Sequence, residues 1–316
     1  MRAVLVCFAI SFTVVASAIP LVQFVARWGG TTKDLAQAIV LDDEGGLFVS
    51  GSTYSTDFPT TTTAIPTGRW CAFTTKLKAL SGSGLYSTVL CGEGQTWGWA
   101  AALASAGELW VAGSSDGTGL PVTADAIQRR FGGYEVPSGS GDAFVARWSA
   151  DGRTVRYATY LGGRGDDSAH ALLADQDGGV WLGGITTSSN FPVSVDAVQS
   201  KRAGGEDAFL AHLDARGRLL FSTYIGGTGN DEITALARLD RDRIVLAGNT
   251  SSPELAFGGH GHGRTDAFVG TVDVSTRKIA WWRRLGGSGD DHVRSVAVLH
   301  DRTIVAAGCE DAITPG

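Results

Sequence analysis

The sequence is short of charge and of reactive side chains. Only 18% of its 316 residues are charged, and it contains 4 cysteines and 1 methionine. Its net charge is −6 and no basic run interrupts it, which argues against the basic face that nucleic-acid binders carry. No H-E-x-x-H motif, P-loop, dinucleotide fingerprint or Cys/His pair occurs. We therefore expect no nucleic-acid partner and no catalytic residues.

Long apolar runs and helical periodicity are missing as well. After residue 18 no segment approaches the roughly 20 apolar residues of a membrane-spanning helix. No segment has the period of an amphipathic helix, which is about 3.6 residues. Apolar residues nevertheless make up 43% of the chain, and 44 residues are glycine. This composition predicts a folded, loop-rich, all-β protein rather than a disordered one.

The N-terminus has the pattern of a secretion signal. Arg2 precedes an apolar stretch from Ala3 to Val15. Ala16-Ser17-Ala18 then places small residues at the two positions that signal peptidase reads. We expect residues 1–18 to be a signal peptide, with an N-terminal anchor as the alternative. Residues 19–316 would form a secreted or surface-attached domain in an oxidising compartment, without a membrane span.

The sequence contains five internal repeats. A triplet of one large residue and two small ones, usually Gly-Gly, starts five times, at residues 28, 90, 161, 225 and 285. A marker glycine follows each triplet at the same offset of 23 residues, at Gly51, Gly113, Gly184, Gly248 and Gly308. A repeat of fixed geometry decides the architecture of the whole chain.

The third copy shows the repeating unit most clearly. Four short apolar runs, separated by Gly/Asp turns, lie at 155–161, 169–174, 180–184 and 207–213, and this pattern predicts four antiparallel strands. Successive copies start 62, 71, 64 and 60 residues apart. Four strands at this spacing predict a β-propeller with one blade per repeat. A β-solenoid, which needs shorter repeats, is the structural alternative.

We expect four complete repeats and a partial fifth that ends after its third strand. Their approximate bounds are 22–80, 85–150, 155–215, 219–275 and 279–316. Nearly all length variation falls between the third and fourth strands. We call the polar loop after the first strand of each repeat, such as Arg164-Gly165-Asp166-Asp167 in the third copy, the Gly-Asp loop. Because antiparallel strands alternate in direction, the variable loop and the Gly-Asp loop share one face of the blade. Insertions on one face of a repeat protein often mark its binding face.

The motifs in these repeats resemble a known family. They are Tyr160-Leu161-Gly162-Gly163, Gly165-Asp166-Asp167, Gly51-Ser52-Thr53, Asp57-Phe58-Pro59 and Gly141-Asp142-Ala143-Phe144-Val145. Together, over roughly residues 22–314, they resemble the SBBP repeat, the seven-bladed β-propeller type. The resemblance implies a secreted or surface-attached bacterial protein, usually without known enzymatic activity. One chain of this length cannot supply seven blades, so it would be a five-bladed ring or a piece of a longer propeller.

The Gly-Asp loops are candidates for calcium, the one cofactor considered. Three of them fit the G-G-x-G-x-D-x-U nonapeptide, and paired carboxylates beside open carbonyls suit a hard cation. The candidate ligands are Asp166, Asp167, Asn230, Asp231, Asp290 and Asp291. The alternative is that each Asp caps its loop by accepting backbone N–H bonds. The first two loops carry Lys33-Asp34 and Gln95-Thr96 instead, so a calcium site in every repeat is excluded.

Two cysteines break the repeat at facing positions. Cys71 replaces an Asp of the other copies and Cys91 replaces a Gly, on the two sides of one expected hairpin. In a secreted chain this arrangement predicts a Cys71–Cys91 disulfide. Two unrelated buried thiols are the alternative.

Trp97 and Trp99 interrupt the second Gly-Asp region, where we expect an exposed aromatic ligand contact. The sequence as a whole favours a non-catalytic binding or structural module with a glycan or a surface protein as ligand. A propeller glycoside hydrolase or lyase is an alternative, with a carboxylate pair drawn from Asp166, Asp167, Asp231 and Asp291. A fragment of a longer surface repeat protein is another.

Overall fold

The computed structural model describes residues 3–7, 27–61, 65–78, 81–133, 139, 141–255, 258–260 and 264–310. Within these ranges the regular structure is β apart from one short 3-10 turn, η1 (Ser105–Gly107). No helix in this described part is long and apolar enough to cross a membrane. The strands form four antiparallel four-stranded sheets and two smaller ones. The predicted all-β class with four-stranded antiparallel units is confirmed.

Four sheets, which we call blades 1 to 4, follow one another in chain order. Blade 1 consists of β2 (Asp34–Leu41), β3 (Gly46–Thr53), β4 (Cys71–Lys78) and β5 (Gly84–Leu90). Blade 2 consists of β6 (Thr96–Leu103), β7 (Leu109–Ser115), β8 (Asp142–Trp148) and β9 (Val155–Leu161). Blade 3 consists of β10 (Asp167–Ala174), β11 (Val180–Thr186), β12 (Asp207–Leu213) and β13 (Leu219–Ile225). Blade 4 consists of β14 (Asp231–Arg238), β15 (Arg243–Thr250), β18 (Asp266–Asp273) and β19 (Ile279–Leu285).

A fifth sheet, blade 5, joins the two ends of the chain. It pairs β20 (Asp291–Val298) with β21 (Ile304–Glu310), and β1 (Ala3–Cys7) lies parallel to β21 on its other side. A small hairpin of β16 (Glu254–Leu255) and β17 (Gly258–His260) lies in the loop between β15 and β18. The rest of the predicted signal peptide lies outside the described residues.

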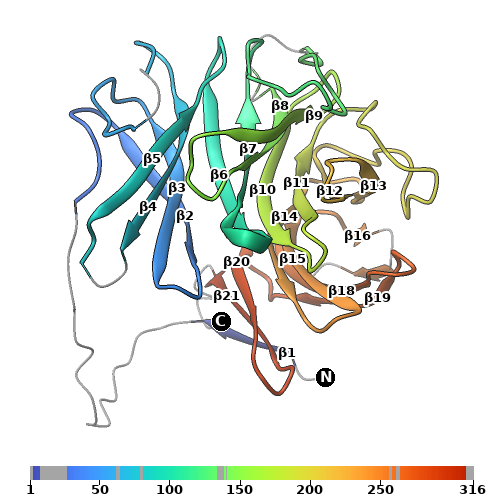
Figure 1. Cartoon of the computed structure of the whole chain (residues 1–316). Coiled ribbons are helices and arrows are strands. Elements are labelled where there is room, and N and C mark those ends of the chain that lie inside the picture. Colours follow the sequence, from blue (N-terminus) through green and yellow to red (C-terminus); the bar gives the residue numbers. More distant parts are fainter. Residues whose placement is uncertain are drawn as a thin grey trace, which may run out of the picture.

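The blades pack side by side as in a β-propeller (Figure 1). β6 packs on β2, β3 and β4 of blade 1, and β10, β14 and β20 pack in the same way on the blades before them. The first strands β2, β6, β10, β14 and β20 also contact one another in sequence, so the first strand of each blade is the inner one. The core lies between blades, where Trp110 and Trp181 are fully buried.

The sheets are offset by one strand from the predicted repeats. The strand that opens each predicted repeat, such as β9 at the start of 155–215, is the outer strand of the preceding blade. The Gly-Asp loops therefore connect the outer strand of one blade to the inner strand of the next. The physical reason lies in the loops. Tight turns such as the one at Asp175–Gly179 join paired strands into hairpins. The Gly-Asp loops instead form hydrogen bonds with the variable loop that follows, as from Gly165 to Ser188.

The marker glycines face a β-bulge in every inner strand. The register slips at the same place in all five, and the skipped residues are Gln37, Trp99, His170, Thr234 and Arg294. Opposite the bulge in β10, a Cβ on Gly184 would lie 1.9 Å from the carbonyl oxygen of Ser168. Bulges re-aim side chains, and only glycine leaves room for this one. The constant offset of 23 residues thus follows from one backbone contact.

The Cys71–Cys91 disulfide predicted from the sequence is confirmed. The two sulfur atoms are bonded where β4 begins and β5 has just ended. In blade 2 the same places are held by Asp142 and Gly162, and a Cβ on Gly162 would lie 2.8 Å from Cγ of Asp142. The cysteines therefore replace a close Asp–Gly contact with a covalent bond. Cys309 is exposed and unbridged.

Removing the disulfide should destabilise the fold. The sequence separation is 20 residues, and closing a loop of this size stabilises a protein by about 3 kcal/mol in the chain-entropy model. We expect the Cys71→Ser/Cys91→Ser variant to unfold at lower denaturant concentration than the wild type. The Cys309→Ser variant is the matched control and should unfold like the wild type. An unchanged midpoint for the double variant would show that the bond is dispensable.

Candidate functional site

The second Asp of each Gly-Asp loop caps that loop. In blade 3, Oδ2 of Asp167 accepts hydrogen bonds from the Gly163 amide at 2.7 Å and from the Ser188 hydroxyl at 2.8 Å. Asp231 does the same in blade 4, and Asp291 accepts the amide of Gly287. These three carboxylates are buried. In blade 1 Asp34 plays this part, although its loop lacks the calcium motif.

The first residue of each pair ties its loop to the blade before it. Oδ1 of Asp166 accepts the Gly141 amide at 3.2 Å, and Oδ1 of Asn230 accepts the Glu206 amide at 3.2 Å. Asp290 pairs with Arg264. Among the described residues no three His, Cys, Asp or Glu side chains converge as a metal site. The geometry is that of the capping alternative, and calcium binding remains a prediction.

Buried carboxylates meet at the blade junctions. A Cβ on Gly162 would lie 2.5 Å from Oδ2 of Asp167 and 2.8 Å from Cγ of Asp142, so the glycine backbone runs between the two carboxyl groups. Burial raises the pKa of Asp142 to about 7 and that of Asp167 to about 7. Both groups hold protons in the folded protein at a pH where they would be ionised in the unfolded chain.

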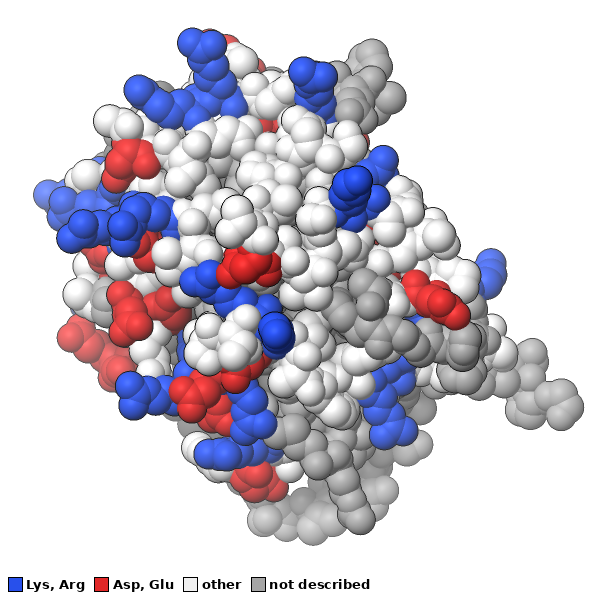
Figure 2. All heavy atoms as spheres, turned by 90° about the vertical axis from the view of Figure 1, so that its right-hand side faces the viewer, with Lys and Arg blue, Asp and Glu red and all other residues white. Residues whose placement is uncertain are grey.

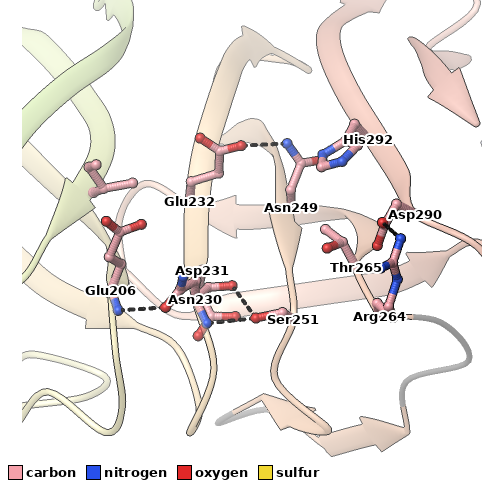
Figure 3. A pocket seen from close by; sticks show the side chains of 11 residues that line it. Glu206, Asn230, Asp231, Glu232, Asn249, Ser251, Arg264, Thr265, Asp290 and His292 are labelled. Carbon is pink, nitrogen blue, oxygen red and sulfur yellow. Dashed lines mark hydrogen bonds and ion pairs between the residues drawn. The ribbon is translucent and has the colours of Figure 1, made fainter.

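The hollow that we call the axial hollow opens beside the inner strands, between blades 3, 4 and 5 (Figure 3). Its volume is about 520 Å³. The side chains that matter for binding come from all three blades and are polar: Glu206, Glu232, Asn249, Arg264, Asp290 and His292. A site of this size can hold a small ligand or part of a chain molecule.

Glu232 and Asn249 hold the middle of the hollow. Nδ2 of Asn249 donates to Oε1 of Glu232 at 2.6 Å, and Oδ1 of Asn249 accepts the Val293 amide at 2.7 Å. The second bond reaches from blade 4 to blade 5. Asn249 is therefore fixed by the junction, and it orients the carboxylate of Glu232 (Figure 3).

The bulges extend this site towards blade 2. His170, the bulged residue of β10, places Nδ1 3.8 Å from Oε2 of Glu232. Trp99, the bulged residue of β6, lies edge-to-face with the His170 ring at a centroid distance of 5.9 Å. We call Trp99, His170, Glu232 and Asn249 the axial cluster. It crosses three blades, and an aromatic ring lies at one end and a carboxylate at the other.

The two glutamates of the hollow have opposite pKa shifts. Burial, with the nearby charge of Glu232, raises the pKa of Glu206. Burial also acts to raise the pKa of Glu232, but the nearby imidazole of His170 and the hydrogen bond from Asn249 outweigh it and hold that pKa below its ordinary value. Two carboxyl groups of one hollow therefore differ in their affinity for a proton.

Charge outside the hollow is mixed. Figure 2 shows Lys and Arg interspersed with Asp and Glu over the face that lies to the right in Figure 1, with uncharged surface between them. No single sign covers this face. Recognition here would depend on particular side chains rather than on a broad field.

The two predicted ligand contacts, Trp97 and Trp99, lie in different surroundings. Trp99 belongs to the axial cluster and donates from Nε1 to the Ser114 hydroxyl at 3.3 Å, whereas Trp97 lies one residue before the bulge. Both are half-buried rather than fully exposed. Sequence reasoning missed Glu206, Glu232 and His170. Only Glu232 left a signal: the residue at its position differs in every copy, and the five residues are Leu35, Trp97, Ser168, Glu232 and His292.

Comparisons with known proteins give distant likenesses. No family model matches the sequence. A curated relative, the regulatory protein FlaEY of Caulobacter vibrioides, is 28% identical over 282 residues, which cover 84% of this chain and 28% of the relative. The chain thus spans less than a third of that relative's length.

Two solved structures resemble the chain weakly. A crystal structure of glucose dehydrogenase has a TM-score of 0.43 and 11% identity, covering 87% of this chain and 80% of that one. The Pan2 WD40 domain of Neurospora crassa has a TM-score of 0.42 and 10% identity, covering 87% and 79%. Likenesses at this level carry no argument about activity.

The junction carboxylates should make stability depend on pH. Because the pKa of Asp142 is about 7 in the folded state and about 3.9 in an unfolded chain, its stabilising contribution is lost as pH rises from about 4 to 7. The Asp142→Asn side chain cannot ionise. We expect the melting temperature of this variant, relative to wild type, to be higher at about pH 8 than at about pH 5.

Asp273 provides the opposite control. Hydrogen bonds from the Thr276 amide and from the Ser275 and Thr276 hydroxyls lower the pKa of Asp273 to about 2. It is ionised in both states between about pH 5 and 8. The effect of Asp273→Asn should therefore be the same at both values. Equal pH dependence in the two variants would contradict the assignment.

Proposed function

We propose that the chain is a secreted, non-catalytic β-propeller that binds a glycan at the axial hollow. The observation that carries the proposal is the lining of the hollow. Carboxylate, amide and guanidinium groups from three blades meet there with the imidazole of His292. Sugar hydroxyls both donate and accept hydrogen bonds, so they match a site that offers both kinds of partner.

The arrangement gives each group a role. Glu232 and Asp290 would accept from hydroxyl groups, Arg264 would donate, and Asn249, already bonded on both sides, would keep Glu232 in place. Trp99, which contacts His170, would offer apolar surface to a ligand long enough to reach beyond the hollow along the axial cluster. A purely apolar ligand would leave these polar groups unpaired, which disfavours it.

Secretion is supported by the disulfide and by the N-terminal pattern, and cleavage after residue 18 would remove β1 from blade 5. Structural disulfides persist in oxidising compartments, and Cys71 is bonded to Cys91. The SBBP resemblance points to the same setting at the cell surface. A regulatory role, as in the name of the FlaEY relative, is compatible with a binding module that has no chemistry of its own.

A propeller glycoside hydrolase or lyase is the second candidate. Of the four carboxylates first considered for it, Asp167, Asp231 and Asp291 are buried caps, and Asp166 accepts the Gly141 amide. Glu206 and Glu232 fit better, because they share one hollow and their pKa values move apart. One could act as acid and the other as base or nucleophile.

Calorimetric titration with chitotetraose, cellotetraose and maltotetraose tests the binding proposal. We expect one of them to bind wild type, and the Glu232→Gln and Arg264→Gln variants to bind it roughly tenfold or more weakly, because each loses a charged hydrogen-bond partner. Asp196→Asn, in a different loop and paired with Arg277, is the matched control and should bind normally. Absence of binding to all three sugars, or equal loss in the control, contradicts the proposal.

The same mixtures separate the two candidates. A binding module leaves the oligosaccharides intact after long incubation. Shortened or unsaturated products that form with wild type and disappear with Glu206→Gln would establish the enzyme instead.

A further inference from the structure

Three aromatic side chains lie where loops meet the strands of blades 1 and 2. Tyr54 directly follows β3, Trp70 directly precedes β4, and Trp97 is the second residue of β6. The rings of Tyr54 and Trp70 contact each other at a centroid distance of 5.5 Å and an interplanar angle of 58°. We call Tyr54, Trp70 and Trp97 the aromatic platform.

The repeat places the two tryptophans at positions that line the hollow in blades 3 and 4. The carbonyl oxygen of Trp70 accepts the first amide of the following inner strand, β6, at 2.9 Å. The carbonyl oxygen of Glu206 accepts the first amide of β14 at 2.7 Å. Trp70 is therefore equivalent to Glu206, and Trp97, the next residue of its inner strand, is equivalent to Glu232.

Tyr54 corresponds in the same way to Ser251. The amide of each donates to the carbonyl oxygen of the residue just before the inner strand of its own blade, at 2.9 Å and 2.8 Å. Ser251, Glu206 and Glu232 all line the axial hollow. The aromatic platform is thus the counterpart of the hollow on blades 1 and 2, at the same face of the propeller.

The rings of the platform are accessible and amphipathic. Tyr54 is 36% exposed, and Trp70 and Trp97 are half-buried. Among the described residues no group bonds to the two indole N–H groups or to the Tyr54 hydroxyl. A sugar presents C–H groups on its faces and hydroxyls around its edge, so it matches a ring with apolar faces and an open polar edge. A purely apolar partner would leave these polar atoms unpaired.

The axial cluster connects the platform to the hollow. Trp99, on the same strand β6 as part of the platform, contacts His170, whose Nδ1 lies 3.8 Å from Oε2 of Glu232. At the intervening junction of blades 2 and 3 the equivalent positions hold two small residues, Gly141 and Ser168. These two positions place no bulky side chain between the platform and the hollow, so one extended ligand can contact both.

We propose that the aromatic platform is a second sugar subsite, on which a pyranose ring stacks while another part of the same glycan lies in the axial hollow. The inference rests on the proposed function and adds the class of ligand, an oligosaccharide rather than a single sugar, because only a chain reaches both subsites. The platform supplies the apolar contact that the polar lining of the hollow lacks. Trp70 and Trp97 would contribute most, since an indole has the largest ring face.

The indole N–H signals in a nuclear magnetic resonance titration, together with calorimetry, test the proposal. The signals of Trp70 and Trp97 are assigned from the Trp70→Phe and Trp97→Phe variants, and the probes are chitotetraose, cellotetraose and maltotetraose. We expect the tetraose that binds to shift both signals. Trp70→Ala should bind it roughly three- to tenfold more weakly, whereas Trp70→Phe, which keeps a flat ring, should bind nearly as wild type.

Chain length provides a readout that a merely structural role of Trp70 would not change. Wild type should bind the tetraose more tightly than the corresponding disaccharide, and Trp70→Ala should narrow that difference. Leu85→Ala is the matched control, since Leu85 is 47% exposed at the other end of blade 1, and it should bind as wild type. Thermal melts check that each variant is folded, and if Trp70→Ala is not, the shifts of the wild-type signals decide.

The outcomes separate this inference from the proposed function. Binding that Glu232→Gln weakens, with unshifted signals of Trp70 and Trp97 and wild-type affinity of Trp70→Ala, overturns the platform and leaves the hollow as the sugar site. Shifted indole signals with normal binding by Glu232→Gln support the platform and overturn the hollow. If none of the three tetraoses binds, both are overturned.

Discussion

One backbone contact sets the geometry of this protein: the bulged inner strand of each blade against a glycine of the next strand. At Gly113 and Gly308 a Cβ would come within 1.7 Å of a carbonyl oxygen, and at Gly51, Gly184 and Gly248 within 1.9 Å. The bulge bends the inner strand and turns its skipped residue out of the regular alternation. Junction packing and the axial cluster both depend on where the bulge lies.

The junctions repeat, but the residues exposed by the bulges do not. The skipped positions hold Gln37, Trp99, His170, Thr234 and Arg294, so each blade presents different chemistry from the same scaffold. Fold and function are thereby separated along the sequence. Glycine, Asp caps and alternating apolar residues recur because every junction needs them, whereas the proposed function places binding specificity in the positions that vary.

Sequence periodicity was enough to predict the strands, the all-β class and the disulfide, because each leaves a local mark that recurs or breaks at a fixed place. Periodicity could not predict which strand begins a blade, because a repeating pattern has no intrinsic first strand. Packing decides that β9 pairs with β8 as the outer strand of blade 2. Sequence periodicity could not predict the axial hollow either. Glu206 and Glu232 come from different blades, and the packing of blade 4 on blade 3 brings them to one hollow. Trp99 was anticipated only as an aromatic exception to the repeat.

The most direct test compares two glycine substitutions by thermal or chemical unfolding. Gly184→Ala places a methyl group against the Ser168 carbonyl, 1.9 Å away, whereas at Gly270 in β18 the nearest atoms lie 3.2 Å from the added Cβ. If the bulge contact governs the blade, Gly184→Ala should cost about 1–3 kcal/mol or more of stability and Gly270→Ala clearly less. Equal effects of the two substitutions would contradict the central role of the bulge.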